Sequence, residues 1–156
     1  METDNKRKKL LAQLIKFAFV GGTSFVIDFV ITLLVSALCR SLGSSTENAA
    51  AIGGVFGFVI SLIYNYFMSM RFVFERREDL DRRMEFLIFT ILSLIGLGLN
   101  EAILYFGVVL CDRLVPSLVE AHPSLITAFV KMVATGIVMV YNFISRKLTL
   151  EKKNDA

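Results

Sequence analysis

The sequence predicts an all-α membrane protein whose four transmembrane helices form two parallel helical-hairpin repeats. The chain has 156 residues, is 55% hydrophobic and contains 14 Phe, which is more apolar side chain than a soluble domain of this size can bury. Four nearly uncharged stretches can each cross a hydrocarbon core about 30 Å thick, which needs about 20 helical residues. These stretches are residues 17–38, 49–70, 85–110 and 125–145.

The second and fourth stretches end on similar residues, which indicates an internal repeat. Tyr64-Asn65-Tyr66 and Tyr141-Asn142-Phe143 are each followed by a Ser-x-basic triplet and an apolar strip, if one inserted residue is allowed. Each half of the chain is therefore expected to form one helical hairpin. Repeats of equal orientation are related by an axis along the membrane normal, and such repeats often enclose a site.

The basic residues set the expected orientation. Of the 17 Lys and Arg, five precede the first stretch, five lie between the second and third, and four follow the fourth, whereas Arg40 and Arg113 occupy the other two loops. The positive-inside rule then places both termini in the cytoplasm. Because acidic residues are interleaved with the loop arginines, the net charge of +3 describes topology and contact with anionic lipids, and no nucleic-acid partner is expected.

Residues 1–156 are expected to form a single integral membrane domain with a flexible basic N-terminus, 1–13, and a C-terminal tail, 151–156. The first apolar run is about twice the length found in a signal peptide, so we expect it to be retained as a helix.

Thr46 is the predicted N-cap of the second helix. Cys39 and Cys111 fall at outer ends of spans, where unpaired thiols are favoured over a disulfide.

Lys131 is the one base inside a predicted span. Thr127 and Thr135 flank it at four-residue spacing and Asn142 lies close to three turns further on, so these residues are expected on one helix face. An ionisable group in the bilayer interior costs several kcal/mol unless it is paired or wetted. Lys131 is therefore either a cation that faces the bundle, where it pairs with an acid or receives a phosphate, or a side chain that snorkels to the outer headgroups.

Asp28, Asn100 and Glu101 are the other polar candidates within the spans. Asp28 lies near mid-membrane and falls opposite Asn100 when the two halves are aligned. It is interpreted either as a hydrogen-bonding group that joins helices or as the lining of a polar seam between the halves. Asp28 and Glu101 are the candidate partners of Lys131, and Glu101 is otherwise a residue of the membrane boundary.

The second helix carries small residues at strict four-residue intervals. Ala49, Gly53, Gly57 and Ser61 form a small-xxx-small face that lets helices approach closely in lipid. Gly21-Gly22 in the first helix is either its counterpart or a local break that lines a cavity. The face is also one candidate interface for a homo-oligomer.

Asn65 and Asn142 lie about one turn inside the predicted cytoplasmic boundary. An aromatic belt with basic anchors explains the neighbouring Tyr residues and the cations Arg71, Arg146 and Lys147, but it does not explain the amides. The two Asn are expected to cap each other's helices or to contact a lipid phosphate. The chain contains no phosphate loop, metal-ligand spacing or nucleophile with a nearby base, so we expect no enzyme activity, no cofactor and no metal.

Several of these segments together resemble the GtrA-like family of small bacterial membrane proteins. The resemblance extends over about residues 14–150 and its clearest element is the ending Asn65 to Phe74; Leu148-Thr149-Leu150 departs from the Phe-Val-Phe that the second copy would be expected to have. It implies a multi-pass protein of the bacterial cytoplasmic membrane that moves a polyprenyl-phosphate-linked sugar to the outer leaflet for cell-surface polysaccharide synthesis. The implied partners are that lipid-linked sugar, membrane lipids and a glycosyltransferase of the same pathway.

Three hypotheses follow. The first is a flippase for the lipid-linked sugar that works as a homo-oligomer. Its candidate substrate-binding residues are Lys131, Asp28, Asn65, Asn142, Asn100, Glu101, Arg71, Arg146 and Lys147. The second is a noncatalytic scaffold that holds a glycosyltransferase at the membrane. The third is a proton-coupled four-helix exporter that uses Asp28 as its coupling carboxylate.

Overall fold

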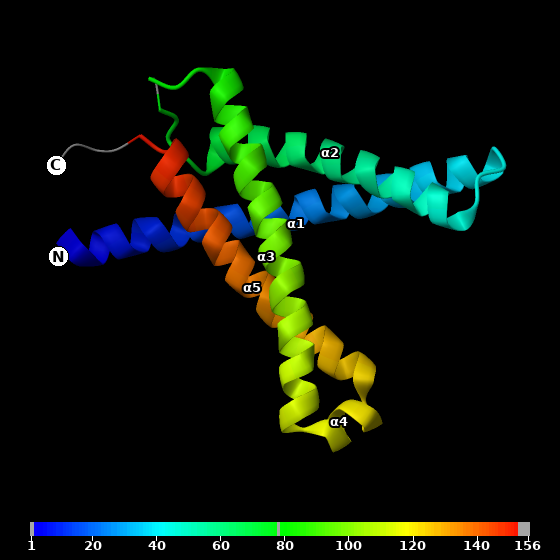
Figure 1. Cartoon of the computed structure of the whole chain (residues 1–156). Coiled ribbons are helices and arrows are strands. Elements are labelled where there is room, and N and C mark those ends of the chain that lie inside the picture. The colour runs from blue at the N-terminus through cyan, green and yellow to red at the C-terminus, as the bar shows by residue number, and fades with distance from the viewer. Residues whose placement is uncertain (1, 78, 153–156) are drawn as a thin grey trace. The chain divides into compact units, whose positions relative to one another are not determined.

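The computed structural model describes residues 2–77 and 79–152, and within them the regular structure is helical (Figure 1). The helices are α1 (Glu2–Ser41), α2 (Thr46–Phe72), α3 (Arg82–Leu114), the short α4 (Pro116–Ala121) and α5 (Pro123–Leu150). α1, α2, α3 and α5 are each long and apolar enough to cross a membrane. The predicted all-α, multi-pass fold with four spans is therefore confirmed.

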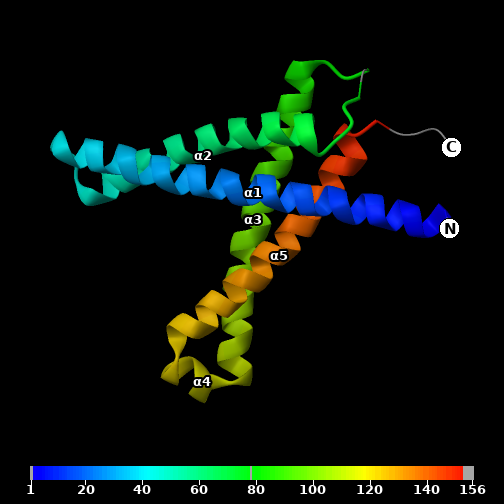
Figure 2. The same cartoon turned by 180° about the vertical axis from the view of Figure 1, so that it is seen from behind.

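The chain divides into two compact units. The first contains residues 1–79 together with 151–156, and the second contains Leu80–Leu150. In the first unit α1 packs on α2, and in the second α3 packs on α5, as both views show (Figures 1 and 2). These pairs are called the first and the second hairpin below.

The helix ends follow local rules, with some differences from prediction. The N-cap of α2 is Ser45, one residue earlier than expected, and its side chain accepts a hydrogen bond from the backbone N–H of Asn48. Gly43, with φ +89°, makes the preceding turn in a conformation that favours glycine. In the second hairpin, Pro116 and Pro123 open α4 and α5, where a missing N–H costs nothing. α4 lies where the sequence predicts only a loop.

Residues 2–13 of the basic N-terminal segment belong to α1, which begins at Glu2. The first two residues of the predicted tail make contacts within the first unit. Glu151 forms an isolated antiparallel bridge with Arg76, the Lys152 N–H donates to the Glu75 carbonyl at 2.8 Å, and Gln13 Nε2 donates to the Glu151 carboxylate at 3.1 Å. Residues 153–156 of the predicted tail lie outside the described residues.

The first hairpin packs through the small-residue face of α2. A Cβ on Gly53 would lie 2.6 Å from the Thr32 carbonyl oxygen, and one on Gly57 would lie 2.6 Å from that of Asp28. The predicted role of this face in close packing is thus confirmed. Its partner is the segment of α1 around Asp28 and Thr32, whereas a Cβ on Gly21 or Gly22 would meet nothing within 4 Å. In this structure α1 of the same chain covers the face at Gly53 and Gly57.

The second hairpin places its glycines on the other helix. The buried residues Val130, Ala134 and Val138 of α5 lie at four-residue intervals, and the close approaches come from α3. A Cβ on Gly107 would meet the Val130 side chain, and one on Gly96 would lie 2.9 Å from both terminal atoms of the Asn142 amide.

Burial fixes how the two hairpins correspond, and no inserted residue is needed. Four-residue series run along both second helices and match one for one, with each pair at least partly buried. The pairs are Gly53 with Val130, Gly57 with Ala134, Ser61 with Val138, Asn65 with Asn142, Ser69 with Arg146, and Val73 with Leu150. On the first helices, the buried residues Phe17 and Ser24 correspond to Phe89 and Gly96, in the register that matches Asp28 with Asn100. The inserted residue assumed from sequence was wrong, because burial pairs Ser69 with Arg146 and not with Ser145.

Candidate functional site

A charged cluster lies on the surface of the second hairpin. Lys131 Nζ of α5 is 3.4 Å from Glu101 Oε1 of α3, and the same oxygen accepts a hydrogen bond from Asn100 Nδ2 at 3.0 Å. The side chains of Lys131 and Glu101 remain 49% and 60% exposed. Glu101, one of the two acids considered for Lys131, is therefore in ion-pair contact with it.

This cluster lies inside the apolar spans. At 1.5 Å per residue, Lys131 is about 12 Å along α5 from Pro123, and Glu101 is about 20 Å along α3 from Leu114. A shallow groove of about 470 Å³ adjoins the Lys131 side chain. Pro123, Ser124, Thr127, Ala128 and Lys131 line it. The second hairpin thus exposes an ion pair and hydroxyl groups within helices that are apolar enough to span a membrane. Lipid tails would solvate neither kind of group.

Lys131 and Asn142 have nearly the same angular position on α5, but only Lys131 is exposed. Asn142 turns towards Gly96 of α3, whereas Lys131 and Thr135 are exposed on the hairpin. The contact line follows every fourth residue, and each such step advances about 40° around the helix. Residues that share a direction three turns apart therefore meet different surroundings.

Asp28 lies at the contact between the helices of the first hairpin. It is partly buried, it takes part in a side-chain hydrogen bond with Thr32, and its Oδ1 would be 2.5 Å from a Cβ on Gly57. This position agrees with the interpretation of Asp28 as a group that joins helices.

The repeated Asn residues differ in their surroundings. Asn65 Oδ1 accepts a hydrogen bond from Ser69 Oγ at 3.0 Å. Asn142 Oδ1 is buried against α3 and has no hydrogen-bond partner within the part of the chain that the structure describes. A buried amide oxygen without a donor costs about 1–3 kcal/mol, so Asn142 holds an unused acceptor inside the second hairpin.

Arg146 does not stand at the surface as the sequence suggested. It is 3% exposed, its guanidinium lies 3.8 Å from the centroid of the Phe89 ring, and its NH2 donates to Ser93 Oγ at 2.8 Å. Arg146 is buried because it continues the buried four-residue series of α5, and because its planar, weakly hydrated guanidinium stacks on an aromatic ring. Arg71, in contrast, is exposed beside the Phe72 ring, and Lys147 is partly exposed.

Glu85 was missed by the sequence analysis. It is 1% exposed and lies one turn before Phe89 on the buried side of α3. In the first hairpin the corresponding residue is Gln13, whose Nε2 donates to the Val73 carbonyl at 2.8 Å. Its place one turn before the buried Phe in both halves is the signal that could have identified it.

The first hairpin also contains a basic groove that the sequence analysis did not foresee. It has a volume of about 270 Å³ and lies where α1 begins and α2 ends. Its lining includes the cations Lys9, Lys16 and Arg71, the amide of Gln13, the strip Phe72 to Phe74, and the carboxylates of Glu75 and Glu151. The groove therefore combines positive charge with an aromatic wall.

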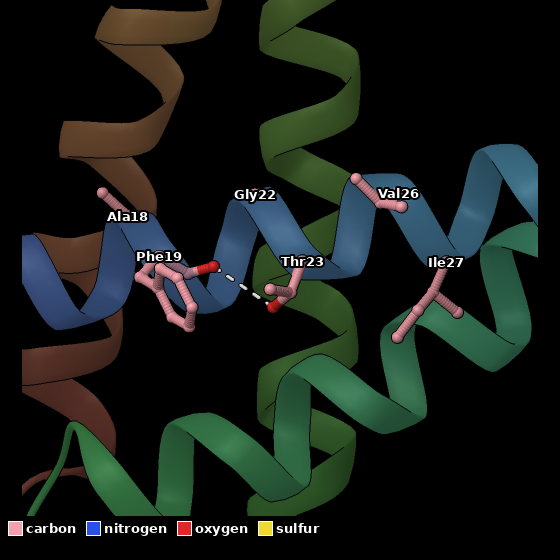
Figure 3. A pocket seen from close by; sticks show the side chains of 6 residues that line it. All are labelled: Ala18, Phe19, Gly22, Thr23, Val26 and Ile27. Carbon is pink, nitrogen blue, oxygen red and sulfur yellow. Dashed lines mark hydrogen bonds between the residues drawn. The ribbon is translucent and has the colours of Figure 1, made fainter.

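A shallow apolar depression of about 570 Å³ runs along α1 (Figure 3). Ala18, Phe19, Gly22, Thr23, Val26 and Ile27 line it. The Thr23 hydroxyl is turned back to its own helix, where it donates to the carbonyls of Phe19 and Val20 at 3.1 and 2.9 Å. The depression therefore offers an almost wholly apolar surface.

Cys39 and Cys111 are free thiols in the structure, and each is partly exposed.

Comparison with known proteins gives one clear result. The model of the family described as GtrA/DPMS, transmembrane domain, matches residues 16–150. No curated protein and no solved structure matches the chain.

Proposed function

The chain belongs to the GtrA/DPMS transmembrane-domain family, and we propose that it moves a polyprenyl-phosphate-linked sugar from the inner to the outer leaflet of the bacterial cytoplasmic membrane, without catalysing a reaction. Family membership by itself supports the coarser statement that this is a membrane protein connected with glycosyl lipids. The observation that carries the finer proposal is the exposed cluster of Lys131, Glu101 and Asn100 within the spans.

The free-energy cost of inserting this cluster into a membrane supports a functional role for it. A Lys disfavours insertion by about 3 kcal/mol at the centre of a transmembrane helix and by less towards its ends. Lys131 lies between these positions, and an ion pair that stays half exposed recovers only part of the cost. A leucine at position 131 would avoid the cost. The cluster therefore supports a polar path for a charged, hydroxyl-rich headgroup whose isoprenoid chain stays in lipid.

In the proposed mechanism Lys131 binds the phosphate in transit and Glu101 is the counterion that the phosphate displaces. Asn100 and the hydroxyl groups beside Lys131 replace water around the sugar. At the predicted cytoplasmic end, Arg71 and Lys147 attract the anionic head. Asp28, Asn65 and the buried Arg146 support this path by holding the hairpins in shape. Asn142, whose buried amide oxygen has no donor among the described residues, is kept for lipid movement.

A homo-oligomer is part of the proposal, because one charged stripe on one hairpin does not enclose a path. Thr127, Lys131 and Thr135 are exposed along α5, and a lipid-facing stripe of this kind is unfavourable. A second copy of the chain is the proposed cover. A glycosyltransferase of the same pathway is the proposed recipient of the flipped lipid.

The test is transport of a fluorescent polyprenyl-phosphate-linked sugar in vesicles that contain the purified protein. Lys131→Ala should lower the transport rate at least tenfold while insertion and helix content stay unchanged, because the pair with Glu101 is exposed and adds little stability. Lys131→Arg keeps the charge and should retain part of the rate, and Arg113→Ala, a cation at the outer end of α3, is the matched control.

Transport by Lys131→Ala at the normal rate would contradict the proposal. If the wild-type protein moves no lipid but copurifies with a glycosyltransferase, and Lys131→Ala does so equally well, the scaffold hypothesis is favoured instead. Drug export that depends on pH and is abolished by Asp28→Asn would favour the exporter.

A further inference from the structure

We propose that the first hairpin holds a binding site for a phosphorylated lipid, with the phosphate in the basic groove and the apolar chain on the depression of α1. The inference rests on the proposed function for the biological identity of the lipid, but its location is argued from the first hairpin alone. It concerns where such a lipid binds before it moves, which the cluster at Lys131 does not address.

The groove presents cations that the protein itself does not neutralise. Lys9 lies 3.5 Å from Glu75, and Glu151 accepts hydrogen bonds from Gln13. Lys16 and Arg71 have no ion pair among the residues that the structure describes. A phosphate that meets both of these cations within one groove gains charge-assisted hydrogen bonds of the stronger kind.

The internal repeat shows that the groove is not a general feature of the helix ends. By the burial register, the counterparts of Lys9, Lys16 and Arg71 in the second hairpin are Asp81, Ile88 and Leu148. The second hairpin therefore has an acid and two apolar residues where the first has three cations. Topology requires basic residues at this end of the chain, but it does not require them to line one groove of one hairpin.

The apolar depression begins within one turn of the groove along α1. Lys16, Phe19, Thr23 and Val26 succeed each other at spacings of three and four residues, which keeps side chains on one side of a helix. Lys16 lines the groove, and the others line the depression, where Gly22 leaves space because it has no side chain (Figure 3). The hairpin thus offers a charged head site that continues into an apolar track.

A basic groove that is followed by an apolar depression fits an amphiphile better than it fits a free phosphate or a neutral lipid. A free phosphate would leave the apolar depression unused, and a neutral lipid would leave Lys16 and Arg71 without a counterion. A polyprenyl monophosphate or a phospholipid with an anionic head has both the charge and the chain. The proposed ligand class is therefore a lipid that carries a phosphate.

The experiment measures equilibrium binding of a radiolabelled polyprenyl monophosphate to the purified full chain in detergent micelles. The double variant Lys16→Gln/Arg71→Gln should bind at least tenfold more weakly. Its matched control is Arg40→Gln/Arg113→Gln, which removes two cations at the opposite helix ends and should bind like the wild type.

A second pair of variants tests the apolar track without changing charge. Gly22→Leu fills the depression and should weaken binding about fivefold, whereas Gly98→Leu, on α3 and equally free of neighbours within 4 Å, should not. Both substitutions occupy open space, so folding is expected to be kept, and circular dichroism checks it.

Competition identifies the ligand. Unlabelled polyprenyl monophosphate should displace the label, and unphosphorylated polyprenol and inorganic phosphate should not. Displacement by phosphatidylglycerol at equal concentration would also support the site and would identify its ligand as a membrane phospholipid.

Normal binding by the Lys16/Arg71 double variant, or full displacement by inorganic phosphate, would overturn the inference. These outcomes are separable from failure of the proposed function. Binding with the expected variant pattern but without any transport would leave the site in place and refute the flippase alone, whereas transport with unaltered binding in the double variant would do the reverse.

Discussion

The two hairpins share one packing register, but different residue types occupy the corresponding positions. In the first hairpin the glycines stand on α2 and face Asp28 and Thr32 of α1, whereas in the second they stand on α3 and face Val130 and Asn142 of α5. A repeat therefore conserves which positions touch, and either helix can supply the small residue that makes the contact close. Sequence identity between the halves underestimates this correspondence, because Gly and Val at one position serve the same geometry.

The polar positions near the repeated Asn residues differ in the same way. Gln13 and Ser69 of the first hairpin correspond to Glu85 and Arg146 of the second. Two neutral side chains are thus replaced by an acid and a base, both nearly buried. The change conserves the total charge of the pair, which a membrane-embedded hairpin requires because an unbalanced buried charge is costly.

Close approach at Gly57 should give the largest effect. Gly57→Val places atoms against the Asp28 carbonyl, so α1 and α2 must separate, and we expect a loss of about 3 kcal/mol in the free energy of unfolding by SDS titration. Gly54→Val, on the same helix with nothing within 4 Å, is the control. If the two variants unfold alike, the glycine face does not set the separation of the helices.

Removal of the buried cation should come next. Arg146→Ala loses the stacking on Phe89 and the hydrogen bond to Ser93, and should cost about 2 kcal/mol, whereas Ser69→Ala at the corresponding position of the first hairpin should cost about 1 kcal/mol or less. Arg146→Lys should rescue little, because an ammonium does not stack as a plane. Equal losses for Arg146→Ala and Ser69→Ala would show that the charged residue at this position of the second hairpin adds nothing to the free energy of unfolding.

The two Asn residues should respond with different magnitude to the same substitution. Asn65→Leu removes the acceptor of Ser69 and should cost about 1 kcal/mol, while Asn142→Leu removes a buried oxygen without a partner and should be nearly neutral or stabilising in the same SDS titration. If Asn142 is kept for lipid movement, Asn142→Leu should still slow transport in vesicles. A large loss of stability in Asn142→Leu would indicate that its amide is satisfied.

The smallest effect is expected at the exposed ion pair of the first hairpin. Lys9→Gln removes a contact of 3.5 Å between two exposed side chains and should change the free energy of unfolding by less than about 0.5 kcal/mol. Asp81→Asn, at the corresponding position of the second hairpin, is the comparison. A clear loss of stability in Lys9→Gln alone would mean that the groove contributes to folding as well as to binding.

Much of the fold could be predicted because membrane crossing depends on local composition. The four spans, their pairing into hairpins and the close-packing face of α2 all follow from uninterrupted apolar length and from residue spacing. The candidate site was predicted less completely. Lys131 and Glu101 were named and do meet, but Arg146 was taken for an anchor at the inner surface and Glu85 was not noticed.

Four membrane spans and a repeated hairpin can be predicted from the amino-acid sequence, because insertion into lipid depends on apolar length and not on the packing partner. The covered side of each helix cannot be predicted in this way. A four-residue contact line drifts around the helix, so Asn142 and Arg146 turn inward while Lys131 stays exposed, and Lys16 and Arg71, far apart in sequence, come to line one groove. Burial of a given polar residue depends on the path of the neighbouring helix, which no local pattern specifies.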